Sequence, residues 1–197
     1  MRRVHGKLNI ELKGNTKLDG ELITACLNVI HKGIVDGLME VAPTIQKMPE
    51  KHRYLTKHFH QFTGNTVASY TAAVVDRGKV KSYFQDDDAP IVHALIQKGE
   101  SVHLDNPVEG KPRTIQGSEE LPGSADYGYI FAENAAEKYA KGIQDAGIVL
   151  TPGVGYARGM VDIWANTRAE LEQYKNSSQF AWHIKKCIAQ AANNYGK

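Results

Sequence analysis

The stretch TVASYTAAVVDRGKVKSYF, residues 66–84, decides the fold of this 197-residue chain. Residues 66–75 are rich in β-branched and aromatic side chains, and the turn Asp76-Arg77-Gly78-Lys79 separates them from a second apolar run, Val80–Phe84. Two such runs joined by a short turn that contains glycine are typical of a β-hairpin. The sequence therefore predicts an antiparallel pair of strands here.

The chain before this hairpin shows one strand pattern and one helix pattern. Residues 4–13 alternate apolar and polar side chains, which predicts a half-buried strand. Residues 18–41 have apolar side chains at steps of three and four, which is typical of an amphipathic helix, with Thr16 or Asp19 as its cap and Pro43 at its end. The apolar positions are Leu8, Ile10 and Leu12 in the strand and Ile23, Leu27, Ile30, Ile34, Leu38 and Val41 in the helix.

Two glycines, Gly33 and Gly37, lie four residues apart near the apolar face of that helix. Each costs about 1 kcal/mol relative to alanine inside a helix. Close packing against a neighbouring element would explain them, and simple tolerance is the alternative.

The C-terminal third shows further helix and strand patterns. Residues 131–143 suit a helix, Ile148–Leu150 a short buried strand, and Ser177 or Ser178 the start of a last helix. Residues 156–164 are expected to be extended, with a helix as the alternative, and Thr167-x-x-Glu170 resembles a capping box that opens a short helix. The expected apolar faces are Phe131, Ala135, Tyr139 and Ile143 in the first helix and Phe180, Ile184, Cys187, Ile188 and Ala191 in the last.

These patterns predict an α+β fold. A largely antiparallel sheet would pack with the N-terminal amphipathic helix and the C-terminal helices, in the order β-α-β-β-loop-α-β-β-α-α. We expect one domain over residues 1–197, with residues 86–126 as a long acidic loop inserted in it, because turn signals are frequent there. Within that loop only Ile91–Ile96 and Ser101–Leu104 suit a short helix and a short strand.

Charge is distributed unevenly although the net charge is only +2. Residues 86–126 carry nine acidic and three basic side chains, and the segments on both sides are net basic over residues 1–85 and 168–197. A solvated acidic loop is one interpretation. The other is pairing between copies of the protein, in which acidic segments contact basic surfaces. The average composition excludes a wholly disordered chain and argues against a simple polycationic binder of nucleic acid.

The two cysteines, Cys26 and Cys187, lie in apolar helical patterns and are expected to be buried free thiols of an intracellular protein. The N-terminal residues do not resemble a signal peptide. No run of about 18 consecutive apolar residues occurs, so no membrane span and no membrane partner are expected.

Motifs for catalysis, metals or cofactors are weak, so we expect no enzyme, no cofactor and no metal. His58-x-His60 could supply two metal ligands of a hydrolase, but no third ligand stands at a diagnostic spacing. The glycines of Gly153–Gly159 match neither phosphate-binding pattern. Basic residues at the two ends suggest an alternative function, contact with nucleic acid phosphates by a small accessory protein. These residues are Arg2, Arg3, Lys185 and Lys186.

Two segments resemble the tail-completion family of tailed bacteriophages, the neck proteins of head-to-tail connectors. Phe62-Thr63-Gly64-Asn65-Thr66-Val67-Ala68-Ser69 is similar to the segment that leads into the family's hairpin. Gly155-Tyr156-Ala157-Arg158-Gly159-Met160-Val161-Asp162 is similar to the family's strand before the C-terminal helix. The chain departs from the family at Asp162, where glutamate is usual, in lacking the following Gly-Thr, and in its longer loop over residues 86–126.

The resemblance implies a structural virion protein of the phage neck, assembled in the cytoplasm of the bacterial host. Such a protein forms a homomeric ring of six or twelve copies that joins the portal and head to the tail and surrounds the DNA channel. Its partners would be the portal protein, other neck and tail proteins and, without sequence specificity, the packaged DNA. The subunit interface is expected at Thr63, Gly64, Asn65, Asp86, Asp87, Asp88, Tyr156 and Arg158.

Overall fold

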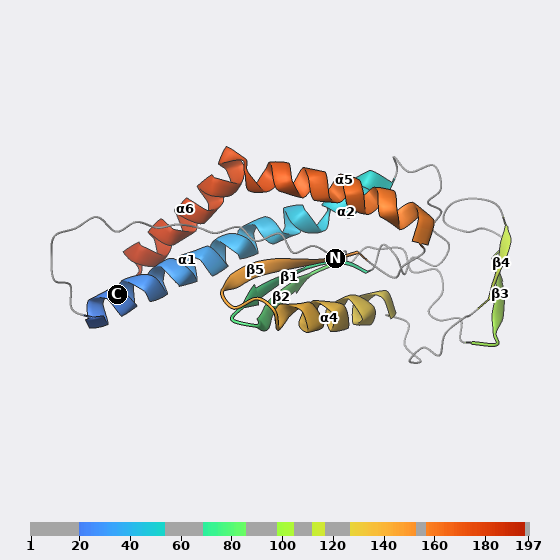
Figure 1. Ribbon diagram of the computed structural model, residues 1–197, viewed down its shortest axis with the longest axis horizontal. Helices are drawn as coiled ribbons and strands as arrows, with labels where there is room; N and C mark the ends of the chain where they lie inside the picture. The colour runs from blue at the N-terminus through green and yellow to red at the C-terminus, as the bar shows by residue number, and fades with distance from the viewer. Residues whose placement is uncertain are drawn as a thin grey trace.

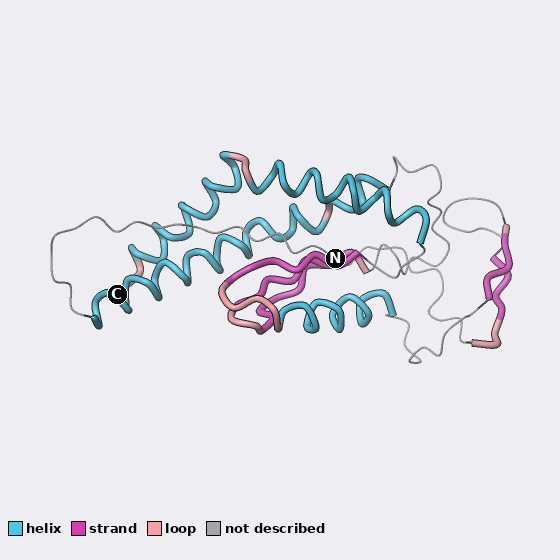
Figure 2. Tube along the Cα trace, in the orientation of Figure 1, coloured by secondary structure: helices cyan, strands magenta, loops and turns pink. Residues whose placement is uncertain are grey.

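The computed structural model describes residues 20–53, 69–85, 98–104, 112–116, 127–152 and 157–195, and it has the predicted α+β fold (Figures 1 and 2). The expected strand at residues 4–13 and the short helix at Ile91–Ile96 lie outside the described residues. The elements are α1 (Gly20–Gln46), α2 (Met48–Arg53), β1 (Tyr70–Asp76), β2 (Lys79–Phe84), β3 (Ser101–Leu104), β4 (Arg113–Gln116), α4 (Tyr127–Ala140), β5 (Ala146–Pro152), α5 (Ala157–Lys175) and α6 (Ser178–Asn193).

The predicted hairpin is the centre of the sheet. β1 pairs antiparallel with β2 and, on its other side, with β5, which gives the strand order β2-β1-β5. Arg77 and Gly78 between β1 and β2 have φ angles of 49° and 79°. Positive φ at both central residues of a two-residue turn matches the right-handed twist of the strands. β3 and β4 form a separate antiparallel pair, and β4 was not expected from the sequence.

Helices cover both faces of the three-stranded sheet (Figure 1). On one face Ala72 and Val74 pack in a core with buried side chains of α1 and α6. On the other face Ala73 and Val75 pack against the alanines of α4. Every side chain from Tyr70 to Val75 is therefore buried, as expected for a strand enclosed by two layers. The members of the α1 core are Leu38, Val41, Ala42, Ile45, Met48, Ala72, Val74 and Ile184.

The glycines of α1 permit a close approach of α6, as the sequence suggested. A Cβ atom at Gly33 would lie 2.8 Å from the backbone nitrogen of Ile188. A Cβ atom at Gly37 would lie 2.7 Å from Cδ1 of Ile184. The two helices are thus in contact at positions where no larger side chain fits.

Several predicted boundaries are wrong. α1 does not stop before Pro43 but continues to Gln46, because burial of Ala42, Ile45 and Gln46 stabilises the last turns more than the proline disrupts them. The short helix α2 was not expected. Residues 157–166 are helical rather than extended, and Thr167 is a fully buried residue inside α5, not a cap.

The face of α4 was also assigned wrongly, whereas that of α6 is confirmed. Small side chains of α4 face the sheet: Ala132, Ala136 and Ala140 are at most 1% exposed, and Phe131 and Tyr139 point outward. In α6 the buried residues are Ile184, Cys187 and Ala191. The Ser177 Oγ atom accepts a hydrogen bond of 3.1 Å from the Phe180 backbone nitrogen and caps this helix.

Candidate assembly surface

The N-terminal half of α1 exposes the apolar side chains that the sequence assigned to the core. Leu22, Ile23 and Leu27 are 48%, 37% and 52% exposed. The thiol-bearing residue between them, Cys26, is exposed as well, contrary to its prediction. In Figure 1 this half of α1 extends past the end of the sheet, so only its C-terminal half lies over the strands. We call Leu22, Ile23, Cys26 and Leu27 the α1 apolar surface.

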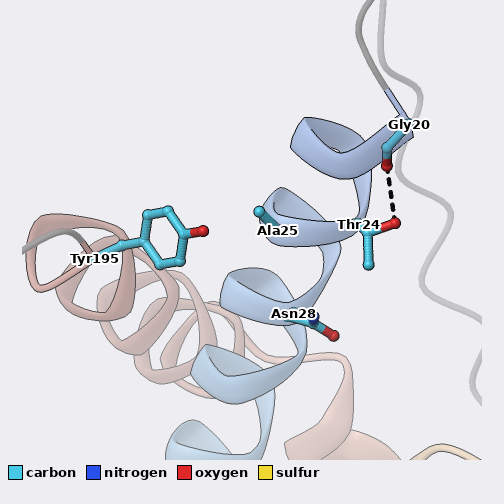
Figure 3. A pocket seen from close by; sticks show the side chains of 5 residues that line it. All are labelled: Gly20, Thr24, Ala25, Asn28 and Tyr195. Atoms are coloured by element: carbon cyan, nitrogen blue, oxygen red, sulfur yellow. Dashed lines mark hydrogen bonds between the residues drawn. The ribbon is translucent and has the colours of Figure 1, made fainter.

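A shallow hollow lies beside this surface, where the end of α6 meets the start of α1 (Figure 3). Its volume is about 440 Å³, and it is widely open to solvent. The Tyr195 ring reaches from α6 toward Ala25 and is 61% exposed. The Thr24 hydroxyl donates a 2.9 Å hydrogen bond to the Gly20 carbonyl and is thus satisfied within the helix. An open hollow with one aromatic wall suits a protein side chain better than an enclosed small molecule.

Residues 22–52 form a helical stretch that is long and apolar enough to cross a membrane by length and composition, although no span was expected. Only 17% of its most apolar 18-residue window is buried. The core helix of a soluble protein meets the same criterion, and Val41, Ala42 and Ile45 are indeed core residues. What the stretch establishes is an excess of uncovered apolar surface on α1.

A second apolar surface lies on α4, on the opposite side of the sheet (Figure 1). Phe131 and Tyr139 are 36% and 45% exposed. They occupy the stripe that the sequence analysis took for the buried face of this helix. We call these two residues the α4 apolar surface.

Polar contacts hold α6 against the C-terminal half of α1. The Glu40 carboxylate accepts hydrogen bonds from His183 Nδ1 and Lys186 Nζ, each at 2.9 Å. The His183 and Lys186 contacts lower the pKa of Glu40 from 4.5 to about 2. Lys186 Nζ also lies 5.3 Å from the centre of the Trp182 ring, which is itself 58% exposed. This charged cluster fixes the angle at which α1 leaves the core.

Two further histidine–carboxylate pairs join separate elements. His31 Nε2 lies 2.7 Å from Asp76 Oδ1 and connects α1 to β1. Burial raises the pKa of Asp76, but the contacts with His31 and Lys81 outweigh burial and hold it below its ordinary value. His52 Nε2 lies 2.8 Å from Glu170 Oε2 and connects α2 to α5. These pairs link elements distant in the sequence, which is a structural role.

Most of the predicted interface residues fall outside the described part of the chain. Arg158 lies in the first turn of α5, not on a strand as its motif suggested. Lys185 is exposed on α6, whereas Lys186 is engaged by Glu40. The residues outside the described ranges are Arg2, Arg3, Thr63, Gly64, Asn65, Asp86, Asp87, Asp88 and Tyr156.

No group of three histidine, cysteine or acidic side chains that could hold a metal occurs within the described ranges. His58 and His60 are not among those residues. Cys187 is buried as predicted, and burial, with the nearby Glu40, raises the pKa of its thiol.

The α1 and α4 apolar surfaces were missed because the apolar spacing of a helix does not reveal which turns meet the sheet. One signal was present: Gly33 and Gly37 mark where α1 approaches α6, and the exposed turns precede them. Comparisons with protein-family models, curated proteins and solved structures find no match to this chain.

Proposed function

We propose that this chain is a structural subunit of a tailed-bacteriophage neck. Identical copies form a ring that joins the portal and head to the tail and surrounds the DNA channel, and the ring is part of the virion. The motifs at residues 62–69 and 155–162 support this class of protein, although the second motif begins a helix here. A proposed non-enzymatic role also fits the open, shallow form of the hollow beside Tyr195.

The observation that carries the proposal is the presence of two exposed apolar surfaces on different sides of one subunit. The α1 apolar surface reaches 52% exposure at Leu27, and the α4 apolar surface reaches 45% at Tyr139. Contiguous exposed apolar side chains in a soluble protein generally mark contact sites. Buried contacts with aromatic residues commonly supply most of the binding energy of such interfaces.

The positions of these surfaces favour contact between unlike sides of neighbouring copies. A ring requires a heterologous interface, in which one surface of a subunit binds a different surface of the next. The α1 and α4 apolar surfaces belong to helices on opposite faces of the sheet, so one subunit cannot bring its own two surfaces together (Figure 1). In the proposed ring, the α1 apolar surface of each copy packs on the α4 apolar surface of the next.

The test combines variants that disable one surface each. Leu27→Lys places a charge on the α1 apolar surface, Tyr139→Lys does so on the α4 apolar surface, and Gln173→Lys, at an exposed position of α5, controls for added charge. Sedimentation velocity across a wide concentration range measures association. We expect the wild-type chain and Gln173→Lys to associate, and each surface variant alone to remain monomeric.

The decisive sample is the equal mixture of the two surface variants. Each retains one intact surface, so a heterologous interface predicts a dimer that contains one copy of each and grows no further. Failure of the mixture to form dimers, while the wild type still associates, would show that like surfaces pair. A wild-type chain that is monomeric at every concentration would overturn the proposed ring.

A further inference from the structure

The two outer strands of the described sheet differ in character. β2 presents exposed lysines, Lys79 and Lys81, and charges of this kind discourage pairing with another strand. β5 has no charged residue over Ala146–Pro152. Alternate N–H and C=O groups of a strand point away from its one partner, here β1. β5 is therefore the edge that suits a further strand.

The side chains of β5 are also incompletely covered. Ile148 and Leu150 pack against the α1 core and are only partly buried. Thr151, whose hydroxyl donates to the Ser69 carbonyl, is fully buried by contrast. Additional apolar side chains beside β5, on the face toward α1, would complete this part of the core.

We propose that residues 4–13 of the same chain pair with β5 as a fourth strand of the sheet. The inference does not depend on the proposed ring. Residues 4–13 alternate, with Leu8, Ile10 and Leu12 on one face, and this pattern matches a strand with one covered side. Placed beside Ile148 and Leu150, that face extends the apolar layer under α1. Main-chain hydrogen bonds supply the affinity, as in other cases of strand addition.

The connection to α1 is long enough for this pairing. The Ala146 end of β5 lies beside His31, because His31 binds Asp76 and Asp76 is the register partner of Ala146. Gly20 precedes His31 by about 16 Å of helix at the usual rise of about 1.5 Å per residue. Residues 14–19 span up to about 20 Å when extended. Residue 13 therefore reaches the start of β5.

The direction of the added strand follows from the same contacts. Gln46 Nε2 donates to the Tyr70 carbonyl, and Tyr70 is the register partner of Pro152, so α1 and β5 run in the same direction. A segment that enters beside Ala146 with residue 13 has its earlier residues toward Pro152. It therefore runs antiparallel to β5, in agreement with the other pairs of this sheet.

Amide hydrogen exchange of the full chain tests the proposal. Ile10→Pro removes a main-chain donor from the middle of the added strand, and Asn15→Pro, outside residues 4–13, is the control. We expect peptides that cover residues 146–152 to exchange at least tenfold faster in Ile10→Pro than in the wild type, with the control unchanged. Unchanged exchange of α6 peptides in both variants verifies that the fold is retained.

Equal exchange of residues 146–152 in the wild type and Ile10→Pro would overturn the proposal. Protection that increases with protein concentration would also overturn it, since residues 4–13 of a second copy would then be the partner. Protection that is independent of concentration and lost in Ile10→Pro supports pairing within one chain.

Discussion

The two halves of α1 have the same apolar spacing and opposite surroundings. In the C-terminal half, Val41 and Ala42 are fully buried and Ile45 is 3% exposed. In the N-terminal half, Leu22 and Leu27 are about as exposed as polar surface residues. Because an amphipathic pattern specifies a face and not a partner, the difference shows that part of this helix is built to pack within the subunit and part is left for another contact.

The largest expected effect comes from truncating the buried half. Ile45→Ala should lower the free energy of unfolding by about 2–5 kcal/mol, because it removes buried methyl groups and leaves a cavity. Leu27→Ala, the matched truncation in the exposed half, should change it by less than about 0.5 kcal/mol in the monomer. Urea unfolding of dilute protein measures both values. Losses of similar size would contradict the division of α1 into two halves.

A smaller effect is expected where the two halves meet at α6. Gly33→Ala should destabilise the protein by about 1–3 kcal/mol, because the new methyl group overlaps the Ile188 backbone and forces the helices apart. Gly20→Ala is the control, since no atom lies within 4 Å of a Cβ added there. That change should stabilise the first turn by up to about 1 kcal/mol. A neutral Gly33→Ala would mean that the close approach of α6 is not required.

The sequence predicted the elements better than their surroundings. The hairpin, β5 and the Ser177 cap follow from local signals, namely β-branched runs, a glycine turn and a side chain that caps a helix. The continuation of α1 through Pro43 and the long α5 depend on tertiary burial, which outweighs a local helix breaker.

The candidate surfaces were harder to predict for the same reason. Leu27 and Tyr139 lie in apolar stripes that resemble those of the core, and only the end of the sheet and the small side chains of Ala132 and Ala136 decide what is covered. The expected interface at residues 63–65 and 86–88 stays a prediction, since these positions lie outside the described residues.

The reactivity of Cys26 tests the central claim, that the α1 apolar surface is buried between copies, most directly. Cys26 is exposed beside Leu27, whereas Cys187 is buried with a raised thiol pKa, so a maleimide should label Cys26 first. We predict rapid labelling of Cys26 in dilute monomer and strong protection in the associated protein, with Leu27→Lys labelled rapidly at every concentration. Equally rapid labelling of Cys26 in monomer and assembly would contradict the claim.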